Sequence, residues 1–508
     1  MRMRLAMIAA VMMIAALMRW GVCGESLWVD ELHTSWVVTD GFQDVAARAA
    51  EGNQTPGYFL VLWFWVQCWG ESEWTLRLPA VIASTLTCGL LAMAVWRLAG
   101  NVWAGCLAGL GLALQQSSIF YGSEARGYAI VMLATSVVLW GLLERHLSAD
   151  GFATRPWCRW GSVVAIASAA AVAVAIHVTA AWSMGILAIV FGVLGIRRRS
   201  GVPLGWRVGG SLAIAMGVAL SLALHHQFLL RTWGVRGQWG AFAVPRFGIA
   251  LGSMWPWFWG VVLPGLWQLG RWGHGRWVHR AIGDGARGDG ARGLAGRQWE
   301  GVLGLLGSLL GATLGAWWIA DQGFLALWHR RFLIGLLPLV CMLGGWLWGE
   351  VVRDIGRGIE RRWPAIGTAV VRGVKGLFAG AAMLVLLIDD GTAAAAVAGR
   401  WQWVVRGEDW RGAIGYLRSQ GGAAELVAVD PGLIEREGSD GYLTSPLRGL
   451  YQIGDLERDP PRIIWRGRAP RDTRWLILRG GEGITASADQ EVRKFGKVWV
   501  IATRKKGA

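Results

Sequence analysis

The chain has 508 residues, of which 54% are hydrophobic and only 17% are charged. A soluble protein of this length carries more charge and interrupts its apolar runs more often, so this composition excludes an ordinary soluble globular protein. Lysine and arginine exceed the acids and give a formal net charge of +16. With no basic patch on a soluble fold, this excess does not indicate nucleic-acid binding; it is typical of the cytoplasmic loops of a membrane protein.

Apolar runs recur along the first 390 residues, and each is close to the ~20 residues that cross a bilayer as a helix. The first run lacks a clear small-x-small cleavage site, so we expect a retained span and not a cleaved signal peptide. These runs predict a polytopic α-helical membrane protein with about eleven transmembrane helices. The predicted spans lie near residues 4–22, 78–97, 102–120, 127–144, 160–177, 181–196, 206–225, 247–268, 301–320, 332–349 and 373–390.

Residues 57–69 are very apolar, but the run is short for a span and is more typical of an interfacial helix. Counting the run as a span would reverse most of the predicted excess of Lys and Arg in cytoplasmic loops, so the positive-inside rule also favours the interfacial interpretation. Residues 40–51 place apolar side chains on one helical face, as in a helix that lies on a membrane surface. We therefore expect residues 23–77 to form a first outer loop with juxtamembrane helices.

The composition changes after residue 390. Trp410, Ile414 and Leu417 follow one another at helical spacing, and four short runs after them are typical of strands. We therefore divide the chain into a transmembrane domain of residues 1–390 and a small α/β domain of residues 391–508. Eleven spans place this second domain outside the cytoplasm.

Asp30 and Glu31 differ from the other acids of the first outer loop. They follow the first span within ten residues, and Leu27, Trp28, Val29 and Leu32 flank them. Burying carboxylates at a membrane surface is costly without a partner or a purpose. Desolvation also raises the pKa of a carboxyl group and makes it a better base. A functional site and an ordinary solvated acidic face both fit these observations.

Three further clusters fall on the same predicted side of the membrane. Glu124 and Arg126 lie between the third and fourth spans, where a structural ion pair is as reasonable as a catalytic role. His225 lies at the outer end of the seventh span, and its neighbour His226 gives no helical metal-ligand spacing. Arg331 lies at the outer start of the tenth span, against the positive-inside tendency, and a bound phosphate would explain it.

Four segments in this order resemble bacterial glycosyltransferases of the GT-C type. The most similar group contains the protein O-mannosyltransferases and aminoarabinose transferases, that is, family 39 and its relatives. The similarity covers roughly residues 1–345, and the start of the C-terminal region resembles the outer domain of many bacterial members. The segments are SLWVDELHTSW, NQTPGYFLVLWFWVQCWGESEWTLRLPAV, YGSEARGYAI and HRRFLIGLLPLV.

The resemblance implies an inverting transfer of a sugar from a polyprenyl-phosphate carrier to an envelope acceptor, which is a lipid, a glycan or a protein. Asp30 would be the general base, Glu31 would orient it or bind the sugar, and Glu124 would help to hold a substrate. Arg77, Arg126 and Arg331 are the candidates for contact with the donor phosphate. The further candidates for substrate contacts are Tyr58, Tyr121, Tyr128 and His225.

The resemblance also places the protein in the bacterial inner membrane, with the lipid bilayer as its environment. Many relatives carry a histidine and two prolines near Gln54–Tyr58, where this chain differs, so the local sugar or acceptor contact is open. No metal ligands are predicted, although a divalent metal is compatible with this type of enzyme. Two rival functions are a transporter or lipid flippase, and a non-catalytic scaffold that presents the C-terminal domain. A transporter usually has charged or broken spans at mid-depth, which these spans largely lack.

Overall fold

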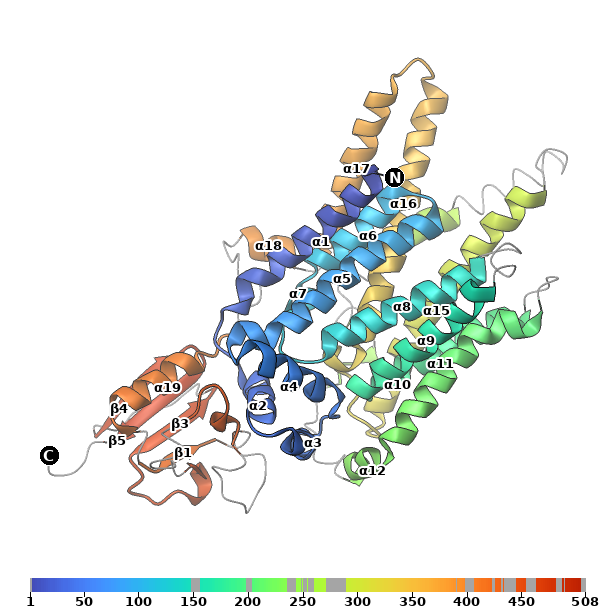
Figure 1. Cartoon of the computed structure of the whole chain (residues 1–508). Helices are drawn as coiled ribbons and strands as arrows, with labels where there is room; N and C mark the ends of the chain where they lie inside the picture. Colours follow the sequence, from blue (N-terminus) through green and yellow to red (C-terminus); the bar gives the residue numbers. More distant parts are fainter. Residues whose placement is uncertain are drawn as a thin grey trace. The chain divides into compact units, whose positions relative to one another are not determined.

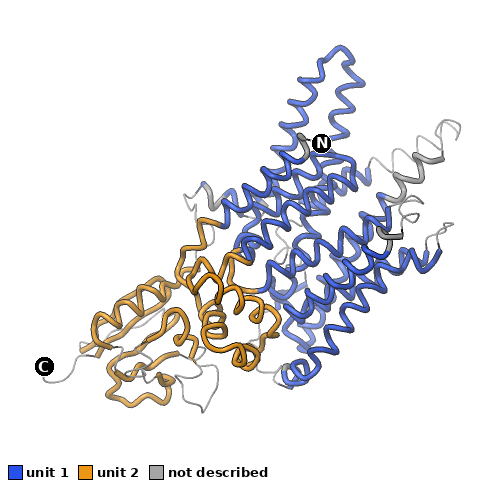
Figure 2. Tube along the Cα trace, viewed as in Figure 1, with its two compact units in different colours: residues 1–19, 80–122, 127–403 blue, residues 20–79, 123–126, 404–508 orange. Residues whose placement is uncertain are grey.

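The computed structural model divides by packing into two compact units (Figure 2). Unit 1 comprises residues 1–19, 80–122 and 127–403, and unit 2 comprises residues 20–79, 123–126 and 404–508. The structure describes residues 2–147, 156–197, 203–234, 244–247, 249, 254, 260–270, 289–389, 391–397, 406–422, 425–430, 433, 445–453, 463–480, 487 and 489–503. The packing thus associates parts of the first outer loop with the C-terminal region, and the linear boundary at residue 390 stays a prediction.

Unit 1 is built from long apolar helices, some of which begin or end in unit 2 (Figure 1). Within the described residues, eight helices are long and apolar enough to cross a membrane, and three more are apolar but shorter. The protein is therefore a multi-pass membrane protein. The helices are α1 (Arg2–Cys23), α5 (Glu73–Ala99), α6 (Val102–Leu114), α7 (Gln116–Gly122), α8 (Tyr128–Leu147), α9 (Pro156–Ile176), α10 (Ala180–Arg197), α11 (Leu204–Leu224), α12 (His226–Gly234), α15 (Asp289–Asp321), η2 (Arg330–Leu336), α16 (Leu337–Arg362), α17 (Thr368–Asp389) and α18 (Thr392–Val397).

The predicted spans coincide with these helices, with two qualifications. Span 247–268 is described only in part, at residues 247, 249, 254 and 260–268, and residues 260–270 are helical. Span 102–120 was predicted as one helix but is two, because Gln115 has extended backbone and separates α6 from α7. The break leaves helix-end carbonyls unsatisfied, and the buried guanidinium of Arg19 donates to the Ala113 carbonyl at 3.1 Å and to Ser118 Oγ at 2.7 Å. This break cannot be read from hydropathy.

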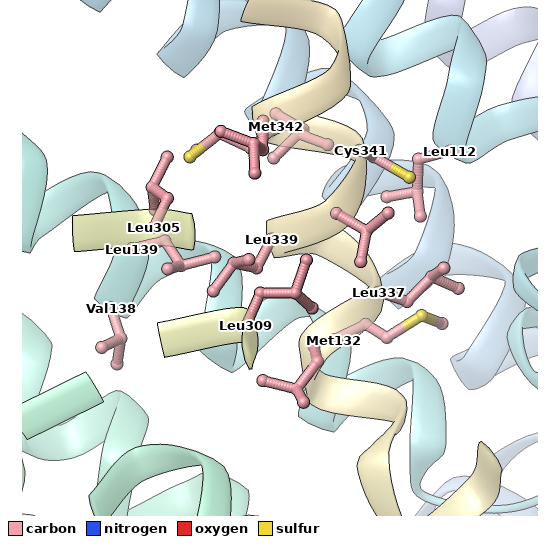
Figure 3. Packing of buried hydrophobic residues seen from close by; sticks show 14 of the residues in the cluster. Leu112, Met132, Val138, Leu139, Leu305, Leu309, Leu337, Leu339, Cys341 and Met342 are labelled. Atoms are coloured by element: carbon pink, nitrogen blue, oxygen red, sulfur yellow. The ribbon is translucent and has the colours of Figure 1, made fainter. Parts of the chain in front are cut away.

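Figure 3 shows part of the core of unit 1, where apolar side chains from α6, α8, α15 and α16 pack together. Helices α6 and α16 approach especially closely. A Cβ added at Gly345 would lie 2.4 Å from the Ala108 nitrogen, and one added at Gly349 would lie 2.4 Å from the Ala104 Cβ. Small residues four positions apart on both helices therefore allow this backbone contact, as is common between membrane helices.

The first outer loop forms α2 (Val29–Thr39), α3 (Phe42–Glu51) and α4 (Gly57–Trp69) in unit 2. Helix α4 has 13 residues, so at ~1.5 Å per residue it is too short for a ~30 Å hydrocarbon core. Phe42 of α3 contacts Trp63 of α4 edge-on, with ring centroids 5.3 Å apart. The length and the packing agree with the interfacial interpretation of residues 57–69.

The C-terminal region contains α19 (Trp410–Ser419) beside one five-stranded sheet, in the order β2-β1-β3-β5-β4. Strand β1 pairs in parallel with β2 and β3, while β5 pairs antiparallel with β3 and β4. The predicted helix and four predicted strands are confirmed. Strand β4 was not predicted, because it is a polar edge strand with mostly charged side chains facing solvent. The strands are β1 (Val427–Val429), β2 (Ile463–Trp465), β3 (Trp475–Arg479), β4 (Gln490–Phe495) and β5 (Val498–Thr503).

Candidate active site

Helix α2 begins at the acidic pair. Asp30 and Glu31 occupy its first turn, where the partial positive charge of the helix terminus favours carboxylates. Glu31 also reaches back to accept a hydrogen bond from the Trp28 backbone N–H at 3.4 Å, which is half of a capping box. The pair is therefore positioned by a short helix that starts just after the first span.

Glu31 is completely buried, and both of its carboxylate oxygens have polar partners. Its Oε1 accepts hydrogen bonds from Arg77 Nε at 2.8 Å and from the Ala125 backbone N–H at 2.9 Å. Its Oε2 pairs with Arg77 Nη2 and lies 3.6 Å from Arg406 Nε. This carboxylate thus connects α2 with α5, with the segment of residues 123–126 and with the C-terminal region.

These partners decide the protonation state of Glu31. Burial alone would raise its pKa, but Arg406, Arg77 and the hydrogen bond from Ala125 outweigh burial and lower the pKa to about 2. Desolvation was expected to make the pair more basic, and for Glu31 the opposite holds. A carboxylate that stays ionised and has both oxygens occupied is suited to holding other groups in place and poorly suited to accepting a proton.

Asp30 is the accessible member of the pair. Its side chain is 26% exposed, and Oδ1 lies 3.9 Å from Arg126 Nη2. Arg126 in turn lies over the ring of Phe59 at 5.9 Å. Asp30 therefore combines exposure with a neighbouring cation, which are properties expected of a base that meets a substrate.

Glu124 lies beside the pair and is completely buried. Within the described residues, neither of its carboxyl oxygens has a hydrogen-bond partner. Burial, followed by the charges of Asp30 and Glu31, raises its pKa to about 8, although Arg406 and Arg126 act in the opposite direction. Glu124 is therefore neutral over much of the physiological range. A buried carboxyl group with unused oxygens is available to a bound molecule.

Arg406 was missed by the sequence reasoning. Its side chain is 1% exposed, and it contacts three groups: Glu31, Glu25 at 3.7 Å and Ser123 Oγ at 3.5 Å. The residue lies in the C-terminal region, far along the chain from α2. No spacing or periodicity connects the two positions, so no signal in the sequence pairs Arg406 with Glu31.

The three arginines predicted to contact phosphate have different environments. The guanidinium of Arg77 is completely buried, and it donates to Glu31 and to the carbonyls of Cys23 at 2.8 Å and Glu25 at 2.6 Å. Arg126 adjoins Asp30, as described above. Arg331 belongs to unit 1, where its guanidinium lies 5.0 Å from the Phe332 ring. The surroundings of Arg77 suit a structural ion pair.

Tyr58 belongs to unit 2 and is buried close enough to Arg126, Glu31 and Glu124 to interact with their charges. It therefore lies at the acidic cluster, which we define as Asp30, Glu31, Glu124, Arg77, Arg126 and Arg406.

Tyr121 and Tyr128 belong to unit 1 and pack edge-on against each other, with centroids 5.1 Å apart. Tyr128 also contacts His177, a residue that the sequence reasoning missed although it stands at the outer end of a predicted span. His177 Nδ1 lies 2.7 Å from Thr179 Oγ1, whose hydroxyl donates to the Phe332 carbonyl at 3.0 Å. These contacts form a second polar and aromatic group.

His225 lies elsewhere in unit 1, at the end of α11. Its Nδ1 is 2.8 Å from the Ser221 carbonyl of the same helix. Among the residues that the structure describes, no group of three or more His, Cys, Asp or Glu side chains could hold a metal ion.

No protein-family model matches the sequence, and no curated protein matches it significantly. Two solved structures of ArnT from Cupriavidus metallidurans do match. The structure bound to undecaprenyl phosphate gives a TM-score of 0.52 at 14% identity, and the apo structure gives 0.53 at 13%. Each alignment covers 98% of this chain and 97% of the ArnT chain. The chain therefore shares the ArnT fold over nearly its whole length, in agreement with the predicted GT-C type of architecture.

Proposed function

We propose that this protein is an integral-membrane glycosyltransferase that moves a sugar from a polyprenyl-phosphate carrier to an envelope acceptor. One observation carries the proposal: of two adjacent acids at the start of α2, Glu31 is buried and held ionised, while Asp30 remains partly exposed beside Arg126. Two carboxylates in such different environments suit two different roles. The fold is shared with a protein whose solved structure binds undecaprenyl phosphate.

In the proposed reaction, Asp30 accepts the proton of the acceptor hydroxyl. The acceptor oxygen forms a bond to the anomeric carbon from the face opposite the phosphate, so the configuration inverts. The bond between that carbon and the phosphate oxygen breaks, and polyprenyl phosphate leaves with the electron pair. Stabilising the leaving phosphate is expected to be the larger catalytic contribution, with base catalysis adding ~10²–10⁴-fold.

The remaining roles follow the environments of the residues. We assign Glu31 to positioning the start of α2 and Glu124 to holding a substrate hydroxyl through its unused carboxyl oxygens. We assign Arg126 to the donor phosphate, with Arg331 as a further phosphate contact, and we assign Arg77 to the ion pair with Glu31. Substrate contacts are proposed for Tyr58, Tyr121, Tyr128 and His225.

The function is tested with wild-type protein in proteoliposomes that contain radiolabelled polyprenyl-phosphate sugars and a total envelope extract. We expect label to appear in the acceptor fraction together with an equal amount of free polyprenyl phosphate. Labelled lipid that changes leaflet with its sugar still attached would instead identify a flippase. Neither transfer nor movement with any donor would favour the scaffold.

We further propose that the protein lies in the bacterial inner membrane with the acidic cluster and the C-terminal region outside the cytoplasm. The support is the predicted excess of Lys and Arg in the cytoplasmic loops. Alkaline phosphatase fused after Ala508 should be active, because this reporter matures only outside the cytoplasm. The same reporter fused after Arg362, at the end of α16, should be inactive. The reverse pattern would show that the proposed orientation is wrong.

A further inference from the structure

The chain just before α19 joins the C-terminal region to the start of α2. Glu408 is buried, and its Oε2 accepts hydrogen bonds from the Val29 backbone N–H at 3.0 Å and from Trp410 Nε1 at 2.8 Å. Its Oε1 pairs with Arg479 Nε at 2.7 Å. Arg479 is the last residue of β3. The end of this strand therefore holds the side chain of Glu408, which accepts a hydrogen bond from the first residue of α2.

A second contact holds the backbone next to it. The hydroxyl of Tyr451 accepts a hydrogen bond from the Leu27 N–H at 3.1 Å and donates one to Glu73 Oε1 at 2.6 Å. The first N–H groups of a helix have no partner within the helix. Here, groups from the C-terminal region satisfy the backbone N–H groups at and just before the start of α2.

Arg406 extends this support into the acidic cluster. Gly407 follows it with a φ of +79°, a conformation that residues with a side chain rarely adopt. The turn at Gly407 lies between Arg406, which contacts Glu25, Glu31 and Ser123, and Glu408, which contacts the α2 backbone. One short segment thus supplies a cation to the carboxylates and an anion to the helix terminus.

We propose that Arg406 is a positioning residue by which the C-terminal region contributes to the geometry of the active site. Its positive charge holds Glu31 and the segment of residues 123–126 in one arrangement, so that Asp30 and Glu124 face the substrate together. The inference rests on the proposed transferase function. It also makes a prediction about the charge state of Glu124 that does not depend on activity.

Several charged or titratable groups surround Glu124. Asp30 and Glu31 face it from α2 and Tyr58 faces it from α4. Arg126 lies on the same segment as Glu124, and Arg406 comes from the C-terminal region. Burial is the main cause that raises the pKa of Glu124 from the ordinary 4.5 to about 8 in the folded protein. Between these values the folded state holds the proton more tightly than the unfolded state does, so Glu124 lowers stability increasingly as pH rises, and the loss levels off above pH 8.

The test compares Arg406→Gln with the wild type, each with and without Glu124→Gln, by thermal unfolding in detergent from pH 4 to 10. The melting-temperature gain from Glu124→Gln should rise with pH and level off near pH 8 in the wild-type background. In the Arg406→Gln background the gain should level off about one pH unit higher, because loss of the positive charge of Arg406 raises the pKa of Glu124 further. Arg493→Gln, on the exposed face of β4, is the matched control and should leave the profile unchanged. Identical profiles for Arg406→Gln and the wild type would overturn the proposal.

Transfer assays provide the second readout. Arg406→Gln should lower kcat by about 10–100-fold, because a misplaced catalytic group is costly, while KM changes far less. If Arg406→Gln does not fold, Arg406→His replaces it, since imidazole is charged only below pH ~6.5. Its activity relative to wild type should then fall as pH rises through that range, and a flat ratio would contradict the proposal. If wild type transfers no sugar, the proposed function fails, and the unfolding profiles still decide the role of Arg406.

Discussion

Replacing Asp30 by asparagine is expected to reduce sugar transfer by about 10²–10⁴-fold, the usual contribution of a general base. Asparagine has nearly the same size and shape but cannot accept the acceptor proton. The loss should fall on kcat, because the amide still fills the site and leaves substrate binding largely intact. Initial rates with a radiolabelled polyprenyl-phosphate sugar measure the effect.

The stability of this variant is expected to change little. Asp30 is partly exposed, and its contact with Arg126 is long at 3.9 Å; surface changes of this kind are usually within ~0.5 kcal/mol. Asp44→Asn, in the first turn of α3, is the matched control from the same outer loop and should retain full activity. Wild-type rates for Asp30→Asn would refute the assignment of the base, and Glu124→Gln would then be the next variant to assay.

The second large effect is expected for Arg77→Met, which should destabilise the protein by about 3 kcal/mol or more. The pair of Arg77 and Glu31 is completely buried, and removal of Arg77 leaves the charge of Glu31 without its nearest counterion. Methionine also leaves the carbonyls of Cys23 and Glu25 without this donor. Thermal unfolding in detergent measures the loss, and transfer should fall with it because α2 loses its main anchor.

Two comparisons separate the buried ion pair from a general effect of losing an arginine. Arg97→Met lies on the same helix, and its pair with Glu144 is half exposed, so about 1 kcal/mol at most is expected. The double variant Arg77→Met/Glu31→Leu removes both charges and should recover part of the stability, but not the activity. If the double variant is no more stable than Arg77→Met, the buried charge of Glu31 is not the cause of the loss.

Much of the fold follows from local sequence. An apolar run long enough to cross a bilayer forms a helix there because no water is present to satisfy its backbone groups. The spans, the short helix of residues 57–69 and most of the C-terminal strands could therefore be predicted from composition and periodicity. The break at Gln115 could not, because the side chain that donates to groups on both sides of it, Arg19, comes from another helix. Strand β4 was also missed, since an edge strand with charged side chains lacks the apolar signal.

The sequence by itself determined that an acidic pair follows the first span, and it identified Asp30 and Glu31 as the residues to examine. Only the tertiary structure decided how the two differ. Glu31 is buried against Arg77 and Arg406, whereas Asp30 remains partly exposed beside Arg126. The physical reason is that ionisation depends on burial and on charges across space. Hydropathy describes neighbours along the chain, and the residue that completes this site comes from the C-terminal region.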